Sequence, residues 1–147
     1  MKRNLIAALV ALMVVGAAGS AWGFGIGIGY RLPSGDFGDD YDGGYGANFA
    51  MLFPVAPKIT AWGDVGYTRF QGKGVYSDID VWGFNGGAKF SLTSLYVGGE
   101  LGYFTKVEDF ALTPLVGIGL GPIDVSARYK LGDHNWWDFR ASISLGR

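Results

Sequence analysis

The sequence predicts an all-β protein, built as an eight-stranded antiparallel up-and-down barrel. Eight stretches alternate apolar and polar side chains with a period of two, which is the period of a β-strand. Taken together, the apolar faces of these stretches cover 40 positions without a single Asp, Glu, Lys or Arg. The chain also has 26 glycines and 16% aromatic residues, and both types are weak helix formers.

The first 21 residues are predicted to be a secretory signal peptide, with cleavage after Ala21 or Gly23. Lys2 and Arg3 precede an apolar run over 5–15, and small residues follow it. An uncleaved membrane anchor is the alternative, but the run is shorter than the roughly 20 residues of a spanning helix. The barrel domain is therefore expected to occupy 22–147 of an exported chain.

The connections between the strands differ in length at the two ends of the expected barrel. The strands are predicted near 24–32, 45–53, 58–69, 81–91, 95–105, 109–120, 123–131 and 136–146. Long polar loops near 33–44 and 71–80 fall at one end, and a tight turn with two prolines falls at the other. Long extracellular loops and short periplasmic turns are typical of transmembrane barrels.

A clean alternation fits two kinds of barrel, which differ in the face that meets the solvent. A lipocalin-like calyx turns its apolar face inward, whereas a membrane barrel turns it outward. Glycines fill about a third of the polar face, which suits a narrow interior better than a hydrated exterior. Each strand also has a ring near the long-loop end, as in an interfacial aromatic girdle: Tyr30, Tyr45, Tyr67, Trp82, Tyr103, Phe110, Tyr129 and Trp137. The sequence therefore predicts a transmembrane barrel with its apolar face toward lipid.

Two residues test the register of this prediction. Pro114 lacks a backbone N–H, so the sixth strand should carry a bulge or a local irregularity there. Trp62 falls on the inward face, and a slip of one residue would place it in lipid.

Charged residues on the polar face predict an ion-pair network in the lumen. The network is expected to contain Asp64, Glu100, Arg128 and Arg140 near mid-depth, together with Lys89. Buried charges are stable only when they are paired, so these residues are interpreted as a polar plug. The alternative is an ion pathway or gate.

Two groups of loop residues are weaker candidates for chemistry. Acidic residues in the first loop resemble part of a calcium loop but lack its terminal Glu and its spacing, so no metal site is predicted: Asp36, Asp39, Asp40 and Asp42. His134 is the single histidine, and Asp133 and Ser77 are the partners it would need for catalysis. An ordinary turn histidine is the preferred interpretation.

Charge and cysteine content restrict the partners. Without Lys2 and Arg3, ten basic residues face thirteen acidic ones, a net charge of about −3, which does not favour nucleic-acid binding. The chain has no cysteine, hence no disulfides. No cofactor is predicted, and the protein is expected to be a monomer that contacts lipid.

The chain resembles the small outer-membrane β-barrel family, the OmpA/OmpX-like and opacity-protein-like group. The resemblance is carried by GIGIGYRLPSGDFGDDY at the start, YVGGELGYF at 96–104 and WWDFRASISLGR at the end. One departure is the end Leu145-Gly146-Arg147, where family members usually have a terminal aromatic residue. The resemblance implies a location in the outer membrane of a Gram-negative-type cell. The resemblance is specific for architecture and says little about activity. The expected role is structural or surface-interactive and non-enzymatic, with loops that meet extracellular ligands or host surfaces. A narrow pore for small solutes and a lipid-modifying enzyme are the alternatives.

Overall fold

The computed structural model describes residues 3–4, 7 and 23–145, and the range 23–145 contains eight strands and one short helix. The elements are β1 (Gly23–Ser34), α2 (Gly35–Asp40), β2 (Tyr41–Ala56), β3 (Ile59–Gly72), β4 (Ile79–Leu92), β5 (Leu95–Phe104), β6 (Asp109–Leu120), β7 (Ile123–Lys130) and β8 (Asn135–Leu145). Among the described residues, no helix has the length and apolar character needed to cross a membrane. The signal segment 1–21 and its cleavage site lie almost entirely outside the described residues, so both stay predictions.

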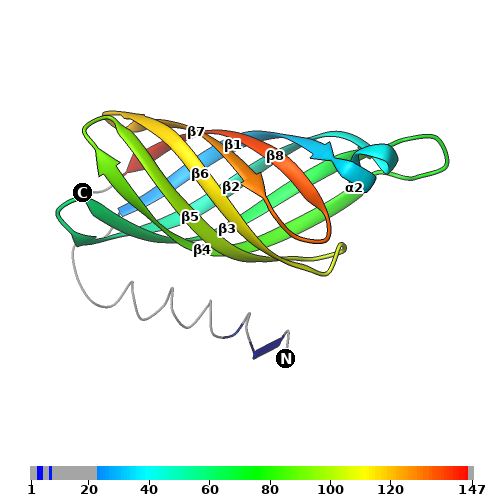
Figure 1. The fold of residues 1–147 in the computed structure, drawn as a ribbon, viewed down its shortest axis with the longest axis horizontal. Helices are drawn as coiled ribbons and strands as arrows, with labels where there is room; N and C mark the ends of the chain where they lie inside the picture. Colours follow the sequence, from blue (N-terminus) through cyan, green and yellow to red (C-terminus); the bar gives the residue numbers. More distant parts are fainter. Residues whose placement is uncertain (1–2, 5–6, 8–22, 146–147) are drawn as a thin grey trace.

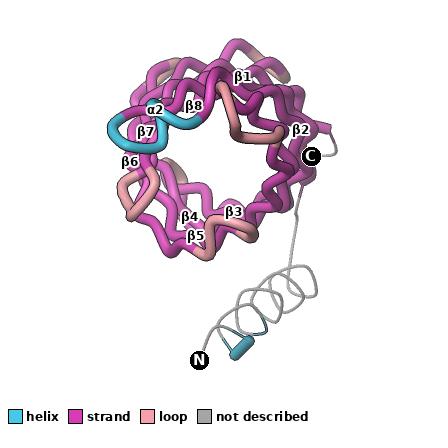
Figure 2. The backbone as a smooth tube through the Cα atoms, turned by 90° about the vertical axis from the view of Figure 1, so that its right-hand side faces the viewer, coloured by secondary structure: helices cyan, strands magenta, loops and turns pink. Residues whose placement is uncertain are grey.

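The eight strands form one closed antiparallel barrel in which each strand pairs with its neighbours in the chain (Figure 1). β1 also pairs with β8, from Phe24 opposite Leu145 to Ser34 opposite Asn135, and this pairing closes the ring seen end-on in Figure 2. Closure leaves no sheet edge with unpaired N–H and C=O groups, which hydrocarbon could not satisfy. The predicted fold class is confirmed.

The two faces of the wall have the predicted orientation. Apolar side chains such as Ile28, Leu101 and Leu120 stand exposed on the outer face, at 63–68% of their surface. Charged side chains are turned inward and buried, with Asp64 and Lys130 each only 1% exposed. This orientation is the reverse of a calyx. In water, this arrangement would leave apolar side chains exposed to solvent and charged side chains buried, which is unfavourable. The outer face is therefore suited to contact with lipid.

The loops at the end that carries α2 are shorter than predicted, because the strands extend farther. β1 continues to Ser34 and β2 begins at Tyr41, so the expected loop at 33–44 is wrong and a short helix joins two long strands. The second loop covers 73–78 rather than 71–80, since β3 runs to Gly72 and β4 begins at Ile79. This connection reaches beyond α2 at the right of Figure 1. The turns at the opposite end are tight, and Gly121 has the positive φ of 65° that favours glycine.

Pro114 marks a gap in strand pairing, not a bulge. β5 and β6 stay in register past Gly99 opposite Pro114. On the other side, the ladder between β6 and β7 covers Leu115 to Leu120, and one further bridge joins Leu112 to Leu131 in the same register. The missing N–H therefore interrupts pairing without shifting it.

Candidate functional site: the layered lumen

A chain of ion pairs crosses the middle of the lumen. Asp64 on β3 accepts hydrogen bonds from Asn85 Nδ2 on β4 and from Arg140 Nη1 on β8, both at 2.7 Å. Arg140 Nη2 also donates to Asp138 Oδ2 at 2.8 Å, and Arg31 Nε lies 3.3 Å from the same oxygen. The Arg140 guanidinium therefore donates to two carboxylates, which its planar array of N–H donors allows.

A second ionic group lies in the lumen next to the first one. Glu100 Oε2 on β5 accepts hydrogen bonds from Arg128 Nη1 on β7 at 2.9 Å and from Trp62 Nε1 on β3 at 3.1 Å. Arg128 Nε donates to Ser126 Oγ at 3.1 Å, and its guanidinium carbon lies 5.8 Å from the centre of the Trp62 ring. Trp62 thus points inward, as its register predicts, and its polar edge is used.

The structure brings the four predicted mid-depth charges together as two pairs, Asp64 with Arg140 and Glu100 with Arg128. Lys89 lies apart from both pairs, because its Nζ is 3.4 Å from Asp124 Oδ2. Asp124 also accepts a hydrogen bond from the Tyr96 hydroxyl. Lys89 is therefore part of a separate lower group.

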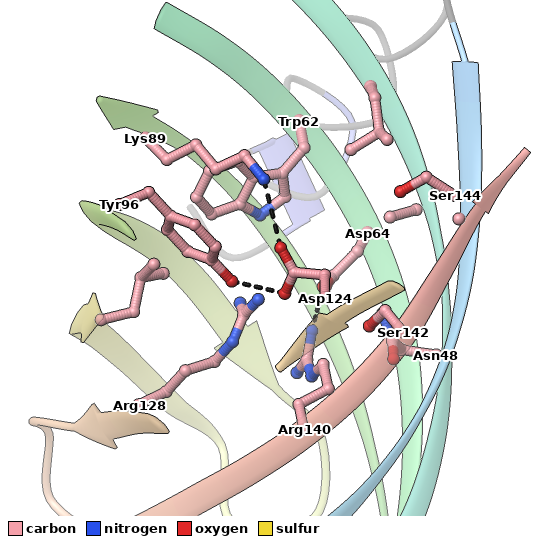
Figure 3. A pocket seen from close by; sticks show the side chains of 14 residues that line it. Asn48, Trp62, Asp64, Lys89, Tyr96, Asp124, Arg128, Arg140, Ser142 and Ser144 are labelled. Atoms are coloured by element: carbon pink, nitrogen blue, oxygen red, sulfur yellow. Dashed lines mark hydrogen bonds and ion pairs between the residues drawn. The ribbon is translucent and has the colours of Figure 1, made fainter. Parts of the chain in front are cut away.

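The lower group borders a small cavity, which is also lined by Asp64, Arg128 and Arg140 (Figure 3). Its volume is about 50 Å³, which is room for a few water molecules. Trp62, Tyr96 and Leu115 pack together along one part of its wall, and Ser142 and Ser144 line another. Both serines are on β8 near Leu145, which pairs with Phe24 at the start of β1, so this cavity belongs to the tight-turn end of the barrel.

An apolar cap fills the lumen at the opposite end. Its buried members are Phe37, Phe70, Val81, Phe104, Ala111 and Trp136. Phe37 comes from α2 and lies 5.1 Å from Phe70 and 5.7 Å from Trp136, measured between ring centres. Trp136 lies 5.1 Å from Phe104 in an edge-on arrangement. α2 lies at the rim of the barrel next to β8 in Figure 2, and the Phe37 ring, packed among the cap residues, anchors it there.

A buried pair, Asp109 with Lys130, joins the apolar cap to the loop before β8. Lys130 Nζ donates to the Asp109 carboxylate and to the His134 carbonyl oxygen, and it lies 4.2 Å from the centre of the Trp136 ring. Asp109 also accepts hydrogen bonds from the backbone N–H groups of Asp133 and His134, at 3.1 and 3.0 Å. Four hydrogen bonds at one carboxylate and one ammonium thus fix the course of this loop.

The eight predicted girdle residues form four ring pairs across neighbouring strands. The pairs are Tyr30 with Tyr45, Tyr67 with Trp82, Tyr103 with Phe110, and Tyr129 with Trp137, at 4.8–5.4 Å between ring centres. Each pair occupies directly opposite positions of two adjacent strands. Tyr103 differs from the others in being only 7% exposed, although it is on the outer face. Paired rings at one level give the wall an amphipathic band.

The remaining sequence candidates lie at the loop end. Asp133 and His134 line a cavity there, whereas Ser77 is an exposed loop residue and is not among the described residues that line it. The first-loop acids fall on or next to α2. Within the described range, no three His, Cys, Asp or Glu side chains are close enough to hold a metal ion.

Sequence reasoning missed three members of the middle layer, Arg31, Asn85 and Asp138. All three are on the polar face of their strands, so the alternation pattern contained the signal. Alternation along one strand does not give the depth of a residue relative to the other strands. Because the strands of a barrel are staggered, residues at different positions along their own strands lie at one level of the lumen. The apolar cap was missed for a different reason: alternation assigns apolar side chains to the outer face, whereas the cap consists of apolar side chains on the inward face and of Phe37 in α2.

Comparison with known proteins gives similarity of fold. No family model and no curated protein matches the sequence. Neisserial surface protein A superposes with a TM-score of 0.60 at 15% identity, over 87% of this chain and 98% of that one. Ail, the attachment invasion locus protein of Yersinia pestis, gives 0.53 at 17% identity, over 84% and 97% of the two chains. A designed transmembrane β-barrel gives 0.52 at 12% identity, over 84% and 95%. The resemblance to small outer-membrane barrels is thus confirmed as a resemblance of fold.

Proposed function

We propose that this transmembrane barrel is a non-conducting scaffold of the outer membrane, which displays α2 and the 73–78 connection at the cell surface. The fold, the lipid-suited outer face and the girdle support the membrane location. The asymmetry of the connections supports an outward orientation of the α2 end, because longer connections are extracellular in such barrels.

The observation that carries this proposal is that two sets of buried side chains, one apolar and one ionic, follow each other along the lumen. The apolar cap blocks the α2 end with packed rings, and the two ionic groups block the middle with paired side chains. An ion that crossed would have to separate packed aromatic side chains and then compete with ion pairs that are almost fully buried. An eight-stranded barrel leaves little room beside such side chains.

Conductance measurements on the folded protein test the closed lumen. The protein is reconstituted in planar bilayers and in vesicles, and heat-modifiable migration on a gel confirms that the vesicle sample is folded. We expect no single-channel steps and no potassium release above that of protein-free membranes. Ohmic steps that grow when Arg140 is replaced by alanine would favour the narrow pore instead.

Cell fractionation tests the location independently. We expect the heat-modifiable band in the outer-membrane fraction, resistant to extraction by high salt. A folded protein in the periplasmic fraction would contradict the proposal, whatever the conductance result.

A further inference from the structure

The loop end of the barrel contains a second and larger cavity, which lies above the apolar cap. Its volume is about 380 Å³, enough for a long amino-acid side chain. It is bordered by α2, by the β5–β6 turn and by the loop before β8. Phe37, Tyr41, Ile79 and Val107 form its apolar part, and all four belong to or pack against the apolar cap. The cavity thus has a fixed apolar floor.

Carboxylates surround this floor. Asp36, Asp40 and Asp133 line the cavity, and Asp133 also interacts electrostatically with the buried Lys130. Lys106 and His134 are the other polar lining residues. Two further basic residues of this end are engaged elsewhere, since Lys73 lies 3.4 Å from Asp42 and Arg69 lies 3.6 Å from Asp78. The cavity therefore keeps an excess of negative charge beside apolar surface.

An apolar tip stands next to the cavity. Val75 is 94% exposed and Tyr76 is 47% exposed, in the connection that projects beyond α2 in Figure 1. The Tyr76 ring lies 5.9 Å from the ring of Tyr41, which lines the cavity. Exposed apolar side chains grouped beside a polar rim are typical of interaction sites. The tip and the cavity therefore offer one continuous surface.

We propose that this surface binds a cationic amphipathic polypeptide, with one lysine or arginine side chain inserted into the cavity. The aliphatic stem of that side chain packs on Phe37, Tyr41 and Val107, and its charged group lies among the three carboxylates. A neighbouring apolar residue of the same polypeptide packs on Val75 and Tyr76. A single small cation would fill the cavity without using the tip, which is why the proposal commits to a polypeptide. The inference rests on the proposed surface display and names its partner class.

Peptide binding to the full folded chain tests the inference. The protein is placed in nanodiscs of zwitterionic phosphatidylcholine, and a fluorescein-labelled hexapeptide of alternating lysine and leucine is titrated by fluorescence anisotropy, with empty nanodiscs as background. We expect saturable binding that weakens with salt, because exposed charges are screened. Matched peptides with glutamate for lysine, or with serine for leucine, should bind at least about fivefold more weakly.

A pair of variants separates the cavity from general acidity. The double variant Asp36→Asn with Asp133→Asn should weaken binding about five- to tenfold, since it removes two of the three lining carboxylates. The control Asp39→Asn removes a charge from the same helix but from a residue outside the cavity, and it should change affinity less than about twofold; Asp42 is kept because it holds Lys73. Equal losses in the two variants, or no loss in the first, would overturn the inference.

The display of this end is tested separately from binding. Because the chain has no cysteine, Val75→Cys gives one thiol at the tip. A membrane-impermeant maleimide should label that thiol on intact cells. Labelling only after lysis would refute the proposed orientation and leave the peptide result in nanodiscs standing, so the two failures are distinguishable.

Discussion

Arg140 on β8 donates a hydrogen bond to Asp64 on β3 at 2.7 Å, although these two strands are not neighbours in the barrel. The contact runs across the lumen and ties opposite parts of the wall to each other. Arg140 also holds Asp138 on its own strand, so the position of one side chain determines how two buried carboxylates are satisfied.

Replacing Arg140 is expected to destabilise the barrel strongly. Arg140→Ala leaves Asp64 and Asp138 buried without their shared partner, and such a loss costs about 3–5 kcal/mol of unfolding free energy. Arg140→Lys keeps the charge but not the fork that reaches two carboxylates, so its loss should be smaller yet measurable. Urea unfolding in phospholipid vesicles measures both. Equal stability of the lysine variant and the wild type would show that the fork is not needed.

Removing Glu100 should also be costly, for the same physical reason in the other ionic group. Glu100→Ala leaves the Arg128 guanidinium and the Trp62 N–H without their acceptor, and we expect a loss of about 3–5 kcal/mol. The double variant Glu100→Leu with Arg128→Met replaces the pair by apolar groups and should recover much of this loss. Urea unfolding is again the measurement, and a double variant no better than the single one would refute the pairing argument.

The anchoring of α2 can be tested by removing one ring. Phe37→Ala empties a site packed between Phe70 and Trp136, and such truncations cost about 3–5 kcal/mol in a closed core. Part of this loss should weaken the packing of α2 on the barrel. A protease should therefore cut near 35–40 faster in the variant than in the wild type. Val75→Ala is the control at an exposed position and should leave the cutting rate unchanged. An unchanged rate in the first variant would contradict the anchor.

The lipid-facing orientation predicts a depth-dependent penalty for charge on the outer face. Val116 lies about halfway along β6, and Leu120 lies at its end. Val116→Arg should cost about 2–4 kcal/mol and Leu120→Arg about 0–1 kcal/mol, because an arginine near the interface reaches water. Unfolding in vesicles compares the two variants of one strand. Equal penalties would argue against a bilayer around this wall.

The glycines of the lumen wall are expected to differ in their tolerance of a methyl group. A Cβ at Gly87 would lie 2.5 Å from the Gly99 carbonyl oxygen and 2.7 Å from Glu100 Cβ, so Gly87→Ala should cost about 1–3 kcal/mol. A Cβ at Gly25 would lie 3.5 Å from its nearest neighbour, the Ile143 carbonyl oxygen, and Gly25→Ala should be tolerated. Folding yield in vesicles and urea unfolding measure the difference. A reversed order would show that space in the wall is not limiting.

The outward and inward faces were predictable because a strand has a strict period of two. Ile28 and Leu101 fall outside, and Asp64 and Glu100 fall inside, from their parity alone. The same parity placed Trp62 inside, since a slip of one residue would have moved both Trp62 and Asp64 to the lipid-facing side of β3.

The loop end was less predictable, because its structure depends on packing between distant parts of the chain. The segment 33–44 is rich in glycine and aspartate, which is typical of a loop, but Phe37 finds a buried site that only the closed barrel provides. Likewise, nothing local in the sequence assigns Lys89 to Asp124 and not to Asp64. Such pairings follow from the stagger of the strands, which side-chain alternation does not encode.

The contact between Phe37 and Trp136 can form only after the barrel has closed. Phe37 lies in the connection after the first strand and Trp136 lies near the start of the last strand, so their rings meet only when the two ends of the sheet have joined. The indole of Trp136 is 1% exposed in the finished ring. The emission of Trp136 is therefore expected to change when the barrel closes. Comparison with a Trp136→Phe chain isolates this change from the signals of the other tryptophans.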